Sequence, residues 1–466
     1  MTVQALPGAR FIQKLALRIA GFAGIDAPLA LGVSVRVWAL VAGLVTLTFV
    51  MRHLSPRAQG YYFAFGSLSQ LTSLVDLGLQ VLVLQFASHE AAHLTFGRGG
   101  AISGPPRAVE RLVSLARFSL AWFGILSLVL IPAMFGIGYW LFSARTDQLP
   151  WKLPWELLCV LVAIDLVLNN FVWLLEGTNQ LSLNYAYRLL RGVVTPLALW
   201  IGLGFGWGLM AIPLSVFMGV VSLLTFLAIT SSGFVLSFFR VRPEVHRLSW
   251  RREILPLQWR LGVSMIGGFV SSSLFVPVAF KFIGPTAAGQ VGLTWTLVEA
   301  MTGVAAMWLA VRFPMMGAMV AKQAWEQLDK VSLTVTIRAT ALATLGATVI
   351  VSFAYMLHVS QSRYAMRLLP LLPLSLFAYA AVPKLISSAM IYYLRAHQRE
   401  PIFLVSALMI PLTLGVTVEG AIWFGPLGIA AGYFLVIVFF QLPAVAYVTA
   451  RCRAQWHRSP VEGLTE

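Results

Sequence analysis

Several charged side chains interrupt long apolar stretches of this sequence, and their chemistry needs an explanation. The cations that a phosphate group would bind are Arg36, Lys384, Arg191 and Arg260, and the carboxylates are Asp76, Asp165 and Glu299. Arginine binds phosphate through a planar fork and lysine binds it as a point charge. A carboxylate inside a helix bundle has a raised pKa, so it can take up and release a proton. If the chain carries an anionic cargo, these four cations are the candidates to bind it, with an interfacial anchor as the alternative for Arg191 and Arg260 near the span ends. The three carboxylates are candidates to bind a coupling H+ or Na+, or to pair with these cations.

Motifs for catalysis, metal binding or nucleotide hydrolysis are missing from the sequence. No Gly-rich loop ends in Gly-Lys-Ser or Gly-Lys-Thr, which excludes the usual ATP-driven transport. His89 and His93 lie four residues apart, but we interpret "SHEAAHL" as a polar helix end rather than as a metal site. Cys159 and Cys452 match neither a disulfide framework nor a metal spacing. We therefore predict no enzymatic activity, no catalytic residue, no metal and no cofactor.

The composition shows which elements must position these charges. Of 466 residues, 59% are hydrophobic and 11% are charged, whereas soluble domains carry about 25% charged residues. The apolar runs extend over about 20 residues without strict alternation, which is the length of a membrane-spanning helix rather than of a barrel strand. The sequence therefore predicts an all-α integral membrane protein, in which a charge within a span faces a cavity or a partner.

Polar or Gly/Pro breaks divide the apolar sequence into twelve candidate transmembrane helices. They cover residues 30–51, 61–86, 113–142, 156–175, 183–205, 207–230, 261–283, 290–311, 332–357, 369–393, 402–424 and 427–449. The breaks at 206–208 and 425–426 are tight Gly or Gly-Pro turns, so we expect helical hairpins there.

The distribution of Lys and Arg predicts the orientation of these spans. With both termini in the cytoplasm, the cytoplasmic segments hold roughly three times as many Lys and Arg residues as the opposite side. This asymmetry also accounts for the net charge of +16 without a nucleic-acid partner. Before the first span, Arg10, Lys14 and Arg18 share one helical face, which predicts a helix lying in the membrane interface.

A short motif occurs twice and indicates an internal duplication. "RHLSPRAQGYY" at 52–62 and "KFIGPTAAGQV" at 281–291 share Pro-x-Ala-x-Gly between apolar runs. Each copy would close the first hairpin of a set of six spans, with a basic interval at 240–260 between the sets. We therefore predict an N-terminal six-helix lobe with the interfacial helix over 1–245 and a C-terminal lobe over 246–466. Because six is even, the two lobes would be parallel repeats.

The segment 54–90 resembles the polysaccharide-export flippases of the multidrug/oligosaccharidyl-lipid/polysaccharide exporter superfamily. The shared residues are Leu54, Ser55, Pro56, Gly60 and Tyr61 in the first hairpin, then Asp76, Leu77, Gly78 and Leu79 in the second span. Many relatives carry an arginine shortly after that acidic element, whereas this chain has Gln85. The resemblance implies two six-helix lobes around a central cavity that opens alternately to each side. It also implies a lipid-linked oligosaccharide as cargo.

The leading interpretation is thus an alternating-access flippase in the bacterial inner membrane that moves a polyprenyl-pyrophosphate-linked oligosaccharide. It would serve the synthesis of cell-surface lipopolysaccharide or exopolysaccharide, with membrane lipids and a polysaccharide polymerase as partners. The alternative is a multidrug/cation antiporter on the same fold, which would need an acidic, aromatic pocket. Arg36 and Lys384 favour the first interpretation because they make the intramembrane charge more basic. A membrane-embedded glycosyl- or acyltransferase is a third hypothesis, with "SHEAAHL" as its only indication.

Overall fold

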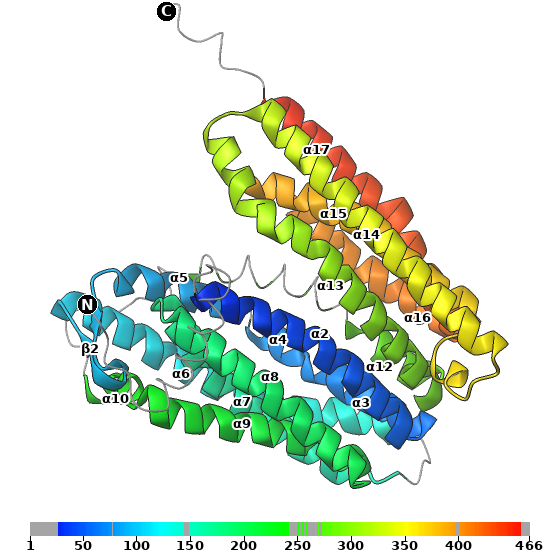
Figure 1. Ribbon diagram of the computed structural model, residues 1–466, viewed down its shortest axis with the longest axis horizontal. Helices are drawn as coiled ribbons and strands as arrows, with labels where there is room; N and C mark the ends of the chain where they lie inside the picture. Colours follow the sequence, from blue (N-terminus) through cyan, green and yellow to red (C-terminus); the bar gives the residue numbers. More distant parts are fainter. Residues whose placement is uncertain are drawn as a thin grey trace, which may run out of the picture. The chain divides into compact units, whose positions relative to one another are not determined.

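The structure, a computed structural model, is built almost entirely from helices (Figure 1). It describes residues 27–76, 78–143, 149–241, 273–397 and 401–457, together with positions 250, 254, 255, 258, 262, 266 and 269. Within this part of the chain, the one sheet is a two-stranded pairing of β1 (Thr95–Phe96) with β2 (Ile102–Ser103). The predicted interfacial helix around Arg10 to Arg18 and the predicted lobe boundary at 245/246 lie outside the described residues.

The chain folds into two compact units. Unit 1 comprises Met1–Ala58 and Leu68–Met265, and unit 2 comprises Gln59–Ser67 and Ile266–Glu466. The helices of the N-terminal half are α2 (Ala27–His53), α3 (Pro56–Ser69), α4 (Leu71–Asp76), α5 (Leu79–Ala91), α6 (Pro106–Phe142), α7 (Lys152–Gly177), α8 (Leu181–Gly204), α9 (Ala211–Thr230) and α10 (Ser232–Arg240). Within unit 1, α8 packs against α2 and α9, and α7 packs against α5, α6 and α9.

Unit 2 is built around α13, α14 and α15. Its helices are α12 (Phe275–Phe282), α13 (Pro285–Ala321), α14 (Trp325–Val359), η4 (Ala365–Arg367), α15 (Leu371–Ala396), α16 (Phe403–Leu435), the π-helical turn η5 (Val436–Gln441) and α17 (Leu442–Trp456). These elements pack in sequence: α13 against α14, α14 against α15, and α15 against α16 and α17.

The helices confirm the predicted all-α membrane fold. In the described part of the chain, eight helices are long and apolar enough to cross a membrane, or nine if the bent segment Pro56–Ala91 counts as one span. Each of the twelve predicted spans has a helix over at least part of it. The number is below twelve for two reasons. Phe403–Trp456 counts once although it covers two predicted spans, and α8 and α12, in the predicted spans 183–205 and 261–283, are not counted. This is therefore a multi-pass membrane protein.

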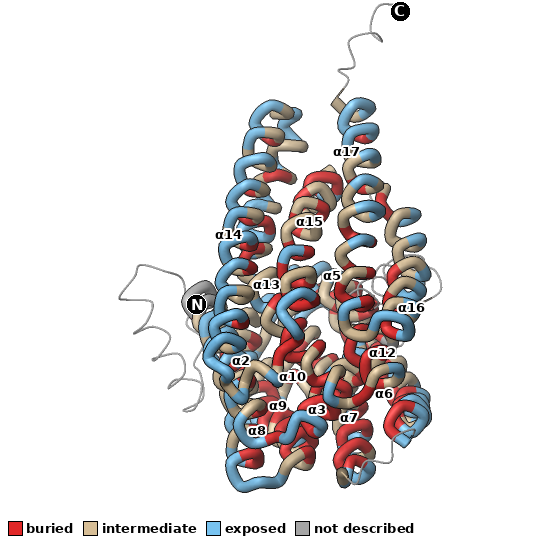
Figure 2. Tube along the Cα trace, turned by 90° about the vertical axis from the view of Figure 1, so that its right-hand side faces the viewer, coloured by how far each residue is buried: buried red, intermediate tan, exposed pale blue. Residues whose placement is uncertain are grey.

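The helix α14 shows how the apolar surface is distributed. Its buried residues Ala339, Ala343 and Ala347 recur every four residues and form a narrow face of small side chains. Large apolar residues such as Leu345 and Val349 are exposed on the other side. Figure 2 shows the same division, with exposed positions running along the length of α14. Small residues inside and large apolar residues outside are expected of a helix that packs closely and faces lipid.

The predicted hairpin at 425–426 is confirmed. Gly425 interrupts α16 with a φ of 61°, a conformation that strains residues with a Cβ atom. The two limbs then approach so closely that a Cβ on Gly420 would lie 2.5 Å from the carbonyl oxygen of Gly428. The hairpin predicted at 206–208 is confirmed by Gly206, with a φ of 79°, between α8 and α9.

The duplicated motif is explained by a contact inside unit 2. Residues 59–67 of α3 belong to that unit, and the Gln59 Nε2 amide donates to the carbonyl oxygen of Gly289, 2.9 Å away. The ring of Tyr61 packs edge-on against Phe280 at 4.9 Å. Gln59 and Tyr61, at and just after the end of the first copy of the motif, therefore pack within unit 2 on residues in and next to the second copy.

Candidate functional site

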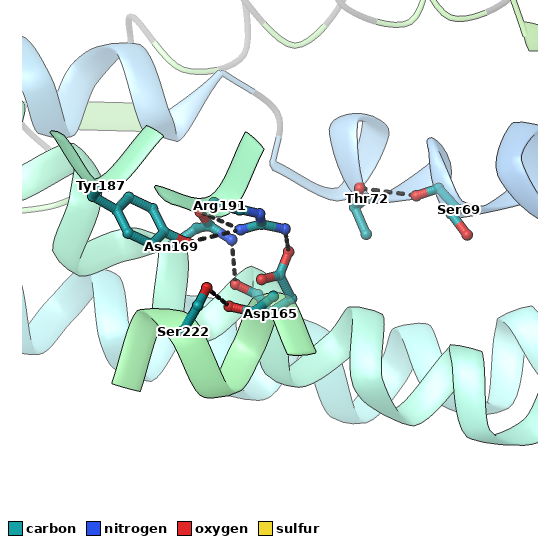
Figure 3. Close-up of polar contacts among 8 residues, drawn as sticks. Ser69, Thr72, Asp165, Asn169, Tyr187, Arg191 and Ser222 are labelled. Atoms are coloured by element: carbon teal, nitrogen blue, oxygen red, sulfur yellow. Dashed lines mark hydrogen bonds and ion pairs between the residues drawn. The ribbon is translucent and has the colours of Figure 1, made fainter. Parts of the chain in front are cut away.

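Two of the predicted charges, Asp165 and Arg191, form an ion pair in unit 1 (Figure 3). The Arg191 Nη2 donates to Asp165 Oδ2 at 2.7 Å, joining α8 to α7. The Arg191 Nη1 donates to Asn169 Oδ1 at 3.2 Å and to the Tyr187 hydroxyl at 3.1 Å. Asp165 and Asn169 are four residues apart on α7, as are Tyr187 and Arg191 on α8, so each pair occupies one helical face. Where the two faces meet, both terminal nitrogens of the Arg191 guanidinium donate hydrogen bonds.

This cluster is only partly covered by protein. The side chains of Arg191 and Asp165 are 28% and 17% exposed, respectively. The second carboxylate oxygen of Asp165 and the hydroxyl of Thr195 are buried and have no hydrogen-bond partner. On the neighbouring helix α9, the Ser222 hydroxyl donates to the carbonyl oxygen of Gly219 at 2.7 Å. The same glycine lies close to α8, because a Cβ on Gly219 would be 3.1 Å from the Thr195 hydroxyl. The cluster thus neutralises a cation inside a span and retains unused polar atoms.

A second cluster forms around Lys384 in unit 2. The Lys384 Nζ lies 5.2 Å from the ring centroid of Trp295 on α13 and 6.0 Å from that of Tyr433 on α16. These distances are typical of cation–π contacts, which hold a cation where water is scarce. Glu299, one helical turn after Trp295, is exposed and acts electrostatically on Lys384. Two of the predicted candidates, Lys384 and Glu299, are thus brought together.

The aromatic residues beside Lys384 form a rigid wall, which we call the aromatic cage: Phe275, Trp295, Phe377 and Tyr433. The ring centroids of Phe275, Trp295 and Tyr433 lie 4.8 to 5.3 Å apart, in edge-on arrangements. The Trp295 Nε1 and the Tyr433 hydroxyl are buried without a hydrogen-bond partner. These two polar atoms interact electrostatically with Glu299 and Lys384, respectively, without forming hydrogen bonds of good geometry. Two N–H or O–H donors and an ammonium therefore lie at one side of this cage.

The remaining predicted residues lie elsewhere. Arg36 is exposed on α2, whereas Arg260 lies outside the described residues. Asp76 is buried, and its Oδ1 accepts the backbone N–H of Gln80 at 3.0 Å. Gly78 between them has a φ of 76°, so Asp76 caps α5 at a break in the predicted second span. Asp76 therefore has a structural role whether or not it binds an ion.

Sequence reasoning did not single out Asn169, Tyr187, Trp295 or Tyr433. A usable signal existed for three of them, because Asn169, Tyr187 and Trp295 each lie four residues from a predicted charge. Tyr433 offered no such signal, since its place in the cage depends on how α16 packs in unit 2. Among the described residues, no group of three His, Cys, Asp or Glu side chains is arranged to hold a metal ion.

The fold is similar to that of solved membrane transporters. No protein-family model matches the chain, and no curated protein matches it. An inward-facing multidrug-resistance MATE family transporter of the MOP superfamily has a TM-score of 0.63 and 16% identity, over 95% of this chain and 99% of that one. The lipid II flippase MurJ, in an inward closed conformation, has a TM-score of 0.67 and 11% identity, over 92% and 89%.

A mutant of the Vibrio cholerae MATE transporter VcmN has a TM-score of 0.55 and 13% identity, over 96% of this chain and 99% of that one. These likenesses extend over almost the whole length of both partners. The chain therefore has the fold that MATE transporters and MurJ share, and the resemblance noted in the sequence agrees with it at the level of the fold.

Proposed function

We propose that this protein is an alternating-access flippase that moves a polyprenyl-pyrophosphate-linked oligosaccharide across the bacterial inner membrane for cell-surface polysaccharide synthesis. The observation that supports this most directly is the convergence of Lys384, the Trp295 Nε1 and the Tyr433 hydroxyl from three apolar helices of unit 2. Such a group of donors suits a phosphate, and aromatic faces suit sugar rings. The similarity in fold to the lipid II flippase MurJ also supports this proposal.

The physical task explains why cations would be kept inside the spans. The sugar–pyrophosphate head must cross a hydrocarbon layer about 30 Å thick, while the lipid tail can remain in the bilayer. A buried cation without an anion is costly, so each one needs a counter-ion when the cargo is absent. In this proposal Glu299 supplies that counter-ion to Lys384, and Asp165 supplies it to Arg191. Arg36, which is exposed on α2, is a third candidate for the phosphate.

The same arrangement suggests how transport could be coupled to an ion gradient. When the pyrophosphate binds to Lys384 or Arg191, it displaces Glu299 or Asp165 from its cation. The displaced carboxylate then takes up H+ or Na+, which removes its repulsion of the cargo. Release of the cargo returns the carboxylate to its cation and frees the ion. In this scheme the ion and the cargo therefore bind, cross and leave together, in the same direction.

A multidrug/cation antiporter is the alternative, and Glu299 is the observation that favours it. An exposed carboxylate beside an aromatic cage is also how proteins bind organic cations. The difference lies in Lys384, whose ammonium already occupies the cation–π position against Trp295. An organic cation would have to displace that lysine, whereas a pyrophosphate would bind to it.

A flipping assay distinguishes these functions. Purified protein would be reconstituted into liposomes with a polyprenyl-pyrophosphate oligosaccharide, and a membrane-impermeant glycosidase would report how much sugar reaches the other face. We expect Lys384→Ala to lose flipping and Lys384→Arg to retain part of it, while Lys330→Ala, at an exposed position on α14, is unaffected. Full flipping by Lys384→Ala would remove Lys384 from the cargo site. Absence of flipping by the natural protein, together with uptake of an organic cation against H+ or Na+, would establish the alternative.

The predicted orientation and partners are tested separately. We propose that both termini lie in the cytoplasm, so a fluorescent protein fused after Glu466 should fluoresce and a phosphatase at the same place should be inactive. Co-purification from the native membrane would show whether a polysaccharide polymerase accompanies the protein.

A further inference from the structure

The ends of three helices in unit 2 are joined by a polar and aromatic cluster that plays no part in the proposed cargo site. It contains Trp325 and Asp329 at the start of α14, Tyr393 and His397 at the end of α15, and Arg453, Trp456 and His457 at the end of α17. Three pairs in this set are spaced by four residues, so each helix end presents two of its members on one face. We call this set the end cluster.

An ion pair and a shared tyrosine connect α14 with α17 and α15. The Arg453 Nη2 donates to Asp329 Oδ2 at 2.5 Å, and Arg453 Nε donates to the same oxygen at 3.2 Å. The Tyr393 hydroxyl donates to Asp329 Oδ1 at 2.8 Å and lies 3.2 Å from His457 Nε2. Asp329 therefore receives bonds from both of the other helices.

The two histidines face each other with one position for a proton between them. His397 Nε2 and His457 Nε2 are 3.4 Å apart. His397 Nδ1 lies 3.0 Å from the carbonyl oxygen of Tyr393, which can only accept, so that nitrogen carries a hydrogen. In a neutral His397 the Nε2 is then an acceptor, and the Nε2–H of His457 points toward it and toward the Tyr393 oxygen. A further proton on His397 Nε2 would place two N–H groups and two positive rings against each other.

Both imidazoles also stack on Trp325. The ring of His457 lies 4.2 Å from that of Trp325 at an interplanar angle of 17°, and His397 lies 5.8 Å from it at 11°. The ring of Trp456 also contacts His397, at 4.8 Å between centroids and an interplanar angle of 43°. These contacts pack the two rings among the ends of α14, α15 and α17, so a charge on both rings would act directly on the contact between the helix ends.

We propose that His397 and His457 form a proton-sensitive clasp, which holds the ends of α14, α15 and α17 together at neutral pH and releases α17 on acidification. The charges that act on His457 are Asp329 from α14, His397 from α15 and Arg453 from its own helix. Burial lowers the pKa of His457, and His397 and Arg453 act in the same direction, whereas Asp329 opposes them. The neutral ring is therefore favoured in the closed clasp.

The sign of the pH dependence follows from that direction. In the open state the imidazole would return to its ordinary pKa of about 6.5. The closed clasp is therefore fully stabilised above that pH and loses stability as the pH falls toward the lowered pKa of His457. The Asp329–Arg453 ion pair keeps its charges over this range, so it does not itself respond.

Spin labels on two exposed positions would measure the opening. Gln327→Cys on α14 and Gln455→Cys on α17 would be labelled in a Cys159→Ser, Cys452→Ala background in lipid nanodiscs, and the distance measured by electron double resonance. We expect one narrow distance at a pH of about 8 and a longer, broader population at a pH of about 5. An unchanged distribution over this range would overturn the proposal.

Two substitutions identify the groups that respond. His457→Gln keeps a side-chain N–H donor but cannot titrate, so the short distance should persist at low pH. His358→Gln, at an exposed position in the last turn of α14, should leave the pH response intact. If His457→Gln and the double variant His397→Gln/His457→Gln both opened at low pH as the natural sequence does, the assignment to these histidines would be contradicted. Hydrogen exchange of α17 in the unlabelled natural chain checks the result without cysteine substitutions, and a pH-independent protection of α17 there would also contradict it.

Discussion

The backbone of Gly60 lies directly against the carbonyl group of Pro285. A Cβ atom on Gly60 would lie 1.9 Å from the Pro285 oxygen, a distance that no pair of nonbonded atoms occupies. Both residues belong to the Pro-x-Ala-x-Gly motif, Gly60 as the last residue of the first copy and Pro285 as the first residue of the second. The repeated motif thus makes a contact that tolerates no side chain at Gly60.

Gly60→Ala should therefore destabilise unit 2. Overpacking a tight contact costs typically about 1–3 kcal/mol, and here the opposing atom is backbone and cannot rotate away. We expect a lower melting temperature of the detergent-solubilised protein, measured by intrinsic fluorescence. Gly66→Ala is the matched control, because it lies on the same helix with no atom near its added Cβ. Equal melting temperatures for the two variants would contradict the close approach.

The Asp165–Arg191 ion pair can be tested by a double-mutant cycle of protein stability. Asp165→Ala leaves the half-buried guanidinium without its anion, and we expect a loss of about 2 kcal/mol, between the values typical of exposed and of buried pairs. The double variant Asp165→Ala/Arg191→Ala should be more stable than either single variant. Flipping should fail in all three if the cluster also serves transport. Thermal unfolding and the flipping assay would be measured on the same preparations.

The Arg188–Glu176 pair supplies a control for that cycle. It has the same N–O distance of 2.7 Å, but its side chains are 43% and 27% exposed. Glu176→Ala should therefore cost less than about 1 kcal/mol. If Glu176→Ala and Asp165→Ala were equally destabilising, the greater burial of the Asp165–Arg191 pair would have no energetic consequence.

Tyr433→Phe separates the two roles of the aromatic cage. The Tyr433 hydroxyl makes no hydrogen bond of good geometry and interacts only electrostatically with Lys384, so its removal should change the melting temperature little. The ring contacts with Phe275 and Trp295 would remain. We expect a reduced flipping rate if the hydroxyl binds the cargo. A large loss of stability would show instead that the hydroxyl has a structural partner.

Asp76 allows a structural role to be distinguished from ion coupling. Asp76→Asn retains an oxygen that can accept the Gln80 N–H, whereas Asp76→Ala removes it and should cost about 0.5–2 kcal/mol as the loss of a helix cap. If Asp76 only caps α5, Asp76→Asn should transport normally at every pH. If Asp76 also couples an ion, Asp76→Asn should fold normally and transport without responding to the ion gradient.

The sequence predicted the helices better than the contacts between them. Apolar runs of about 20 residues located the spans, and Gly425 marked a hairpin that the structure contains, because both features are local. The break at Gly78 was not predicted, since the apolar run continues through it. The contacts of residues 59–67 group them with unit 2, a relationship that no local pattern in the sequence indicates.

The candidate site was predictable as a set of residues but not as a set of pairs. Burying a charge within a span is costly, so Asp165, Arg191, Glu299 and Lys384 could be singled out from residue type and position alone. Which carboxylate accompanies which cation depends on the rotation of each helix about its axis. That rotation is set by packing between distant segments, as in the approach of Trp295 and Tyr433 to Lys384. A single sequence does not contain this information in a local pattern.

The assignment of residues 59–67 to unit 2 has a consequence for biosynthesis. Gln59 is translated 230 residues before Gly289, whose carbonyl its side chain binds. Residues 59–67 are therefore synthesised long before the segments that they contact in unit 2. Unit 2 cannot be completed from its own contiguous stretch of chain. Two separately expressed halves divided near residue 245 would have to find each other through this segment before unit 2 could reach its final form.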